Sequence, residues 1–199
     1  MKENTETKSA DPIALKIEKN LLDSRKIFLW GEVNDESAKH IIERLFFLNE
    51  TDDQKEITIL INSPGGANTS GMAILDAMDA IRSPVSTLCM GLAASFGALI
   101  LAHGKKGRRF AYPRSRIMIH QPHLMGQFTA PAADLGIFAR HIEKDRREIN
   151  RILATATGKT ETEIENDTDR DFWFSAQEAL DYGLIDAVAT DKILNPSVR

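Results

Sequence analysis

The chain has 199 residues, 42% of them hydrophobic and 27% charged, which is typical of one globular domain. Its formal net charge of −4 gives no sign of a nucleic-acid-binding surface, and its single cysteine, Cys89, excludes a disulfide within the chain. The polar stretch MKENTETKSADP at the N-terminus lacks an apolar signal core, so we expect a protein of the reducing cytoplasm.

Strands and helices alternate through the first two thirds of the sequence. In chain order we expect a helix over 13–22, a strand over 26–30, a helix over 36–48, a strand over 57–62, a helix over 69–82, a strand over 85–90, a helix over 96–103, strands over 108–111 and 116–119, a long helix over 132–157, two short helices over 160–168 and from 175 to 183, and a strand over 184–188. This alternation predicts an α/β domain with parallel strands and right-handed crossovers, whose site lies at the carboxyl ends of the strands. We expect residues 1–20 to form a mobile arm, 21–190 a single domain and 191–199 a frayed tail.

An uncharged run covers residues 85–103 and is long enough for a membrane-spanning helix. Pro84 stands at its start, and Gly91 and Gly97 interrupt it. A buried strand, a turn and a buried helix that ends at Gly104 account for the run better, so no membrane span is predicted.

Ser95 stands where this strand turns into the helix 96–103, among small residues. The first N–H groups of a helix have no intrahelical partners, and the helix dipole there favours negative charge. An oxyanion that forms beside Ser95 would therefore be stabilised by the N–H of Phe96. An ordinary N-cap serine is the alternative interpretation.

A serine hydroxyl is a weak nucleophile unless a base activates it. His120 is the best candidate, since it directly follows the strand 116–119, and Pro122 fixes the exit of the chain behind it. His120 and His123 could also be read as a pair of metal ligands, but no third ligand is evident, and we expect no metal.

A third group should be a carboxylate that orients the imidazole. The sequence DTDRDFWF offers three candidates, Asp167, Asp169 and Asp171. Asp171 adjoins the apolar run 172–174, so we expect it to be the one that is held at a buried edge. A solvated acidic turn is the alternative for the whole run.

The sequence SPGG at 63–66 follows the apolar strand 57–62. Glycines at such a position let backbone N–H groups approach a ligand closely, although a tight turn would explain them equally well. A tetrahedral intermediate needs two donors, and the N–H groups of Gly66 and Phe96 would supply one each.

The helix predicted over 132–157 would be roughly 40 Å long. Its apolar residues gather towards both ends, and the middle, 143–148, is charged all round. We expect it to project from the body and to pack its apolar stripe against a partner chain; a solvated face of an ordinary helix is the alternative. TGKT at 157–160 is similar to a phosphate loop, but it follows a helix, so we interpret it as a helix end at Gly158.

Four motifs together resemble a known family: INSPGG at 61–66, GLAASFGA at 91–98, RIMIHQP at 116–122 and DRDFWFSAQEALDYGLID at 169–186. In this order and spacing, from about residue 21 to 188, they are similar to the proteolytic subunit of the Clp protease family. The resemblance implies a crotonase-like α/β fold of repeated ββα units and an ATP-dependent serine endopeptidase. It assigns the nucleophile to Ser95, the base to His120, the acid to Asp171, the oxyanion hole to Gly66 and Phe96, and a contact between subunits to Arg170.

The resemblance also implies a tetradecamer of two heptameric rings stacked through the long helix, formed by this chain alone or with a paralogue. An AAA+ unfoldase such as ClpX, ClpA or ClpC would feed unfolded proteins into its chamber for protein quality control. ATP would serve only that partner, so we expect no cofactor, no nucleic acid and no membrane for this chain.

This sequence also departs from the usual family pattern. The segment 123–134 is slightly longer than usual and carries an extra proline, Pro131. Thr58 and Leu60 stand where many members have aromatic residues for ATPase docking. The N-terminal arm also lacks the usual axial-loop sequence. Two alternative functions stay open: an acyl-CoA hydratase or isomerase of the same superfamily, and a non-catalytic ring subunit.

Overall fold

The computed structural model describes residues 12–122 and 131–190. Within them lie seven helices: α1 Pro12–Asp23, α2 Asp35–Thr51, α3 Asn68–Ala80, α4 Phe96–His103, α5 Ala132–Thr157, α6 Glu161–Asp167 and α7 Ala176–Tyr182. The strands are β1 Lys26–Trp30, β2 Ile57–Ser63, β3 Val85–Ala94, β4 Arg109–Ala111, β5 Arg116–Ile119, β6 Phe172–Ser175 and β7 Ala187–Val188. Part of the predicted arm, 12–20, is therefore helical, while 1–11 and the tail 191–199 lie outside the described residues.

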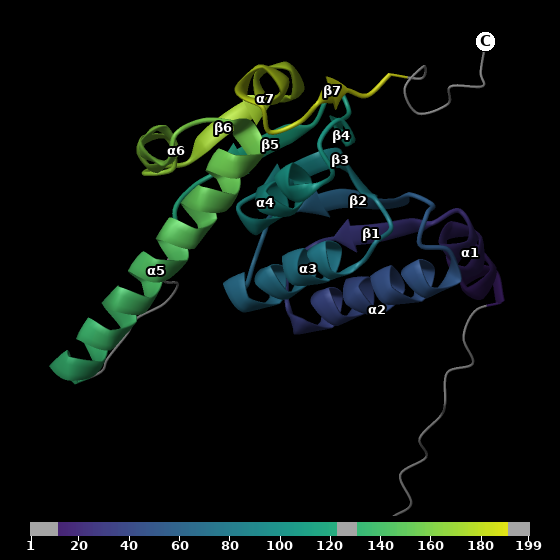
Figure 1. Cartoon of the computed structure of the whole chain (residues 1–199), viewed down its shortest axis with the longest axis horizontal. Coiled ribbons are helices and arrows are strands. Elements are labelled where there is room, and N and C mark those ends of the chain that lie inside the picture. The colour runs from purple at the N-terminus through teal and green to yellow at the C-terminus, as the bar shows by residue number, and fades with distance from the viewer. Residues whose placement is uncertain (1–11, 123–130, 191–199) are drawn as a thin grey trace, which may run out of the picture.

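One mixed sheet forms the body, with the strand order β1-β2-β3-β4-β7 and all of these pairs parallel. Helices α2 and α3 lie side by side along the sheet (Figure 1). Strand β2 is buried along most of its length, as expected of an inner parallel strand. Strand β1 lies at the edge of the sheet and alternates the buried Ile27 and Leu29 with more exposed residues. The predicted α/β architecture with parallel strands is confirmed.

Strand β3 is longer than predicted and changes partners along its length. Its first half pairs with β4, and Leu92–Ala94 pair with β5. The register against β2 shifts from Ile61 opposite Cys89 to Ser63 opposite Ala93, so β3 contains two extra residues there. This bulge directs the end of β3, and with it Ser95, towards β5.

Polar side chains satisfy the backbone of the bulge. Asn62 Oδ1 accepts a hydrogen bond from the Leu92 N–H at 3.1 Å, and Ser115 Oγ accepts one from the Gly91 N–H at 3.3 Å. The Ser115 hydroxyl donates in turn to the carbonyl of Cys89 at 2.9 Å. Strand β2 and the residue just before β5 thus hold β3 at the point where its ladder with β2 is interrupted.

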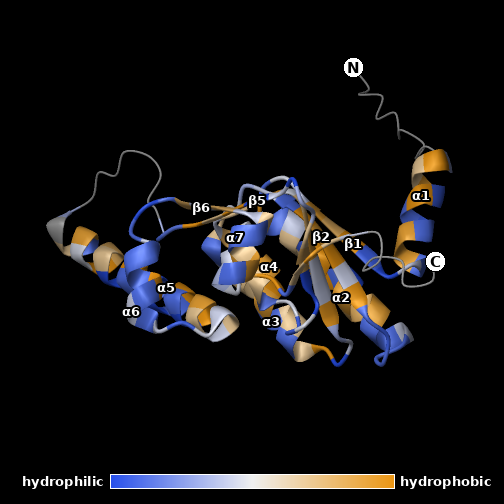
Figure 2. Ribbon diagram, turned by 90° about the horizontal axis from the view of Figure 1, so that it is seen from above, coloured by the Kyte–Doolittle hydropathy of each residue, from blue (hydrophilic) through white to orange (hydrophobic). Residues whose placement is uncertain are grey.

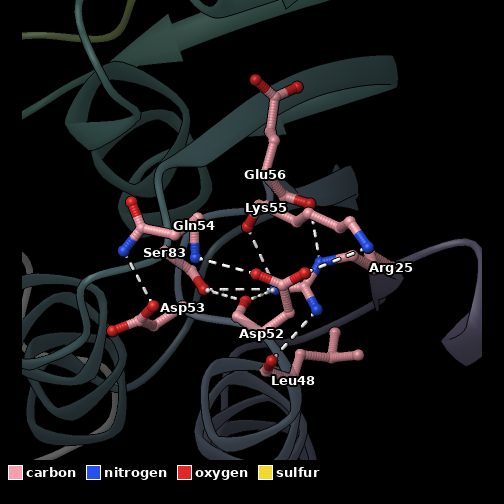
Figure 3. Close-up of polar contacts among 8 residues, drawn as sticks. All are labelled: Arg25, Leu48, Asp52, Asp53, Gln54, Lys55, Glu56 and Ser83. Atoms are coloured by element: carbon pink, nitrogen blue, oxygen red, sulfur yellow. Dashed lines mark hydrogen bonds and ion pairs between the residues drawn. The ribbon is translucent and has the colours of Figure 1, made fainter.

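Arg25 fastens the opposite, amino-terminal edge of the sheet (Figure 3). It precedes β1 with a φ of +57°, and its guanidinium donates to the carbonyl of Leu48 in α2 and to those of Asp52, Lys55 and Glu56, each at 3.0 Å. A further hydrogen bond reaches Ser83 Oγ, just before β3, at 3.1 Å. One side chain therefore joins the starts of β1, β2 and β3 to the end of α2.

A second arginine joins the other end of the sheet to α5. Arg109 is 1% exposed, donates to the carbonyls of Ala102 and Ala156, and pairs with Asp186 at 2.7 Å. Burial raises the pKa of Asp186, but the hydrogen bonds from Arg109 outweigh it and hold that pKa below its ordinary value. The inner half of α5 and the start of β7 are thereby fixed to β4.

The long helix α5 has the predicted bounds and extends away from the body, as predicted (Figure 1). Its inner half is packed, with Ile149 and Leu153 buried. In its outer half, 132–144, Leu135, Ile137 and Phe138 are 43%, 57% and 39% exposed. Figure 2 shows that hydrophobic and hydrophilic residues alternate along this part of the ribbon. The outer half thus carries exposed apolar residues, of which Leu135 and Phe138 lie three positions apart and share one face of the helix.

Several details of the prediction are wrong. β6 was not predicted, the last strand is only two residues long, and Gly104 does not end α4 in a left-handed conformation, since its φ is −52°. Glycine is needed at 104 for another reason: a Cβ there would lie 2.4 Å from Thr87 Oγ1. The uncharged run 85–103 divides into β3 and α4, and no helix in the described part of the chain is long and apolar enough to cross a membrane.

Candidate active site

Ser95 occupies a strained turn between β3 and α4. Its φ of 53° and ψ of −123° lie in a region that residues other than glycine rarely adopt. Ser95 holds the N-cap position of α4, but its side chain makes no capping hydrogen bond within the described residues. Its hydroxyl lies 2.9 Å from His120 Nε2 instead, so the N-cap interpretation does not explain this serine.

His120 lies between the serine and a carboxylate. Its Nδ1 is 2.9 Å from Asp171 Oδ1, and its side chain is 16% exposed. The antiparallel pairing of β5 with β6 explains this contact. Its last pair is Ile119 opposite Phe172. His120 comes directly after Ile119 and Asp171 directly before Phe172, so they are the next opposite positions of this antiparallel pair. Side chains at such opposite positions are close enough to interact.

The three candidate aspartates have different partners. Asp167 accepts a hydrogen bond from the Tyr182 hydroxyl at 2.6 Å, and the Asp169 carboxylate lies 3.3 Å from Gln121 Nε2. Burial and the bond to Asp167 raise the pKa of Tyr182 above its ordinary value, so that hydroxyl stays a donor. Asp171 is the candidate that contacts His120.

The predicted reason for choosing Asp171 is wrong. Its side chain is 55% exposed, and the neighbouring Phe172 and Trp173 are 39% and 50% exposed, so no buried edge holds the carboxylate. The register of β6 places it instead. β6 has the sequence FWFS, which is short and half exposed, so the sequence pattern does not predict it as a strand.

The SPGG loop lies directly against Ser95. A Cβ on Gly65 would be 2.6 Å from Ser95 Cβ and 2.9 Å from the Phe96 nitrogen. Gly66 has a φ of +153°, and a Cβ there would be 2.1 Å from the carbonyl oxygen of Val33, so only glycine fits. Gly65 therefore lies against Ser95 and the Phe96 nitrogen, and Gly66, the other predicted donor residue, directly follows Gly65 in the chain.

Both N–H groups suit an oxygen ligand. Val33 accepts from the Ala67 N–H and donates to the Gly65 carbonyl, which turns the Gly66 N–H away from Val33. Phe96 is the first residue of α4, where an N–H has no intrahelical partner. Ser63 Oγ accepts the Gly65 N–H at 3.1 Å and fixes the loop from within.

The remaining predicted site residues lie outside this group. The Arg170 side chain is 87% exposed, 3.7 Å from Asp169. His123, of the considered metal pair, lies outside the described residues, and within 12–122 and 131–190 no three His, Cys, Asp or Glu side chains could hold a metal ion. As predicted, TGKT is a helix end: Gly158 closes α5 in the left-handed region, and Thr160 caps α6.

Sequence reasoning missed Asn62, Ser115 and Gln121, which support the site from neighbouring segments. Asn62 directly precedes SPGG, and Gln121 directly follows His120. The sequence shows that these residues are polar, but it does not show which groups they hydrogen-bond. Their roles depend on register and on loops that meet only in the folded chain.

The arrangement can perform nucleophilic acyl transfer. An imidazole within hydrogen-bond distance of a hydroxyl can take its proton, and a carboxylate on the other ring nitrogen stabilises the imidazolium that results. Two backbone donors beside the hydroxyl can stabilise an oxyanion.

A family model described as Clp protease matches residues 9–192. This match covers nearly the whole chain and agrees with the crotonase-like α/β fold that the sequence motifs implied.

Proposed function

The chain belongs to the Clp protease family, and from this premise we propose that it is a serine endopeptidase with Ser95, His120 and Asp171 as its catalytic residues. The continuous contact from hydroxyl to imidazole to carboxylate, with both distances at 2.9 Å, is the observation that carries the proposal. The strained backbone of Ser95 supports it, because such strain is often found at active sites.

The reaction follows from these positions. His120 Nε2 takes the proton of Ser95 Oγ as the oxygen attacks the carbonyl carbon of the scissile peptide bond. The carbonyl electron pair moves onto its oxygen, which accepts hydrogen bonds from the N–H groups of Gly66 and Phe96. When the intermediate collapses, the C–N bond breaks and His120 returns the proton to the leaving amine. Water then hydrolyses the acyl-enzyme with His120 again as base.

The same contact distinguishes the peptidase from the alternatives. An acyl-CoA hydratase or isomerase of this fold uses the paired N–H donors but has no need of a serine, imidazole and carboxylate in line. A non-catalytic ring subunit has no need of a strained serine. The observed geometry is therefore best explained by hydrolysis.

Clp protease family membership implies ring assembly and work with an ATPase partner in general. For this chain we propose stacked heptameric rings, formed alone or with a paralogue, with the outer half of α5 and Arg170 at the contacts. An AAA+ unfoldase of the ClpX, ClpA or ClpC type would deliver unfolded proteins in the cytoplasm. The exposed apolar residues of α5 and the exposed Arg170 support this proposal.

The test is labelling by a fluorophosphonate probe together with hydrolysis of a fluorogenic peptide. We expect Ser95→Ala to abolish labelling and to lower hydrolysis by orders of magnitude, with an unchanged native mass. Ser24→Ala, a serine outside the site, serves as the control. Wild-type turnover by Ser95→Ala would overturn the proposal, as would no labelling of the unsubstituted chain with paralogue and ATPase present.

A further inference from the structure

The segment that carries Asp171 is exposed, although it must hold a carboxylate in place. The side chains of Asp169, Arg170 and Asp171 are 57%, 87% and 55% exposed. A carboxylate in such a segment has little packing to fix it, and its position against His120 depends on how the chain on both sides is anchored.

One anchor is Thr168, directly before this segment. Thr168 is fully buried, and its hydroxyl lies 2.7 Å from the carbonyl oxygen of Ile164 and 3.2 Å from Asn150 Oδ1 on α5. The other anchor is β6, which begins at Phe172. Asp171 therefore lies next to the sheet but at the end of a three-residue exposed stretch.

Gln121 connects this exposed stretch to His120, the residue that Asp171 contacts. Its backbone N–H donates to the Thr168 carbonyl at 2.7 Å. Its side-chain Nε2 donates to the Asp169 carbonyl at 2.8 Å and lies 3.3 Å from the Asp169 carboxylate. Because Gln121 directly follows His120, these bonds tie the backbone of the imidazole to the segment of the carboxylate.

We propose that Gln121 is a positioning residue whose side-chain amide holds the Asp169–Asp171 segment so that the Asp171 carboxylate stays on His120 Nδ1. This inference rests on the proposed function. Gln121 touches neither substrate nor reacting atoms; it acts through Asp171. Its backbone N–H fixes Thr168, directly before the segment, and its side-chain amide fixes Asp169, the first residue of the segment.

The first test is Gln121→Met, which keeps the length of the side chain and the backbone bond but removes the amide. We expect kcat for peptide hydrolysis to fall about 10- to 100-fold with KM unchanged, since a small misplacement of a catalytic group has effects of this size. Gln121→Glu, which has the same shape but no donor and adds a charge beside Asp169, should show the same fall. Gln177→Met is the matched control, because it removes a 2.9 Å glutamine–aspartate bond on the exposed face of α7.

The second test asks whether Gln121 acts through Asp171. In an Asp171→Asn background, adding Gln121→Met should not slow fluorophosphonate labelling of Ser95 any further, because the carboxylate that Gln121 positions is already absent. An equal fold-loss in both backgrounds would overturn the inference, as would wild-type kcat in both Gln121 variants or a change in KM alone.

The two proposals fail separately. If the unsubstituted chain shows no Ser95-dependent labelling or hydrolysis, the proposed function is wrong and the inference falls with it. If Ser95-dependent hydrolysis is present and Gln121→Met behaves like Gln177→Met, only the inference is wrong. Native mass and thermal unfolding of each variant exclude loss of assembly or fold as the cause.

Discussion

At the scale of single residues, the most informative feature is the backbone of Ser95. A φ of 53° with a ψ of −123° suits glycine, yet a serine stands there. The surrounding contacts hold it: the Ser95 N–H donates to the Met118 carbonyl at 2.9 Å, and the Ser95 carbonyl accepts from Ala98 and Leu99. Such strain costs on the order of 1–3 kcal/mol and persists only where the neighbouring structure fixes it.

We therefore expect Ser95→Gly to be more stable than Ser95→Ala. Both variants lose the hydroxyl, but only glycine relieves the strain. After the greater freedom of glycine in the unfolded chain is subtracted, the difference should be about 1 kcal/mol in the free energy of unfolding. Denaturant titration of the two variants measures it, and an alanine variant as stable as the glycine variant would show that the turn is not strained.

Cys89 illustrates a residue that the site does not use. It is fully buried in β3, and burial raises the pKa of its thiol to about 11. Since the thiolate is the nucleophile, this cysteine is inert at neutral pH despite its place a few residues before Ser95. The reactivity of a side chain therefore depends on its own environment and not on how close it lies in sequence to a reactive residue.

At the scale of elements, the bulge in β3 decides where Ser95 lies. Without the two extra residues, β3 would continue beside β2 in unbroken register, and its end would not reach β5. Asn62 and Ser115 hydrogen-bond the backbone of the bulge from the two neighbouring segments. The nucleophile and the base thus meet because one strand changes partners halfway.

The bulge yields a prediction for Asn62. Asn62→Ala leaves the Leu92 N–H without its acceptor, which costs about 1–3 kcal/mol of stability. Asn62→Asp keeps an acceptor of the same size and should lose less. Thermal unfolding of the two variants, compared with peptide hydrolysis, checks both effects, and we expect the alanine variant to be the worse in each. Equal losses in the two variants would show that the bond to Leu92 does not hold the bulge.

How far the sequence predicts the site depends on which elements carry it. The helix after Ser95 and the loop at Gly66 are local patterns whose expected and observed positions agree, whereas β3 continues to Ala94, beyond its expected end at Met90. β6 has four residues of which two are exposed, so no periodicity marks it, and the contact of Asp171 with His120 depends on its register. The bulge is likewise a relation between strands, which the pattern of one strand cannot reveal.

At the scale of the whole molecule, the outer half of the long helix is a part that the domain does not need for its own core. The inner half of the helix is fastened by Ile149, Leu153 and the bonds to Arg109, whereas its outer half leaves Leu135, Ile137 and Phe138 exposed. Leu135 and Phe138 lie three residues apart and so share one face of the projecting helix, whereas Ile137 does not face Leu135. An exposed apolar face of this kind is typical of an interaction surface. In the proposed assembly, a second ring covers this face.

This proposal predicts the behaviour of Leu135→Glu. Covering a leucine contributes about 1.5–3 kcal/mol, and placing a carboxylate in the same contact adds a desolvation cost, so each ring-to-ring contact should weaken by at least tenfold. Because the contact repeats around a ring, the stacked species should be lost while the monomer stays folded. Native mass measurement and circular dichroism on the same sample test this.

Thr155→Glu is the matched control for Leu135→Glu. It adds the same charge at an exposed position on the inner half of the same helix, where no ring contact is proposed. If both variants keep the mass of the unsubstituted protein, the outer half of α5 does not join the rings. If both lose it, charge on the helix rather than the apolar surface is responsible. Loss in Leu135→Glu alone is the expected result, because only that side chain belongs to the exposed apolar face.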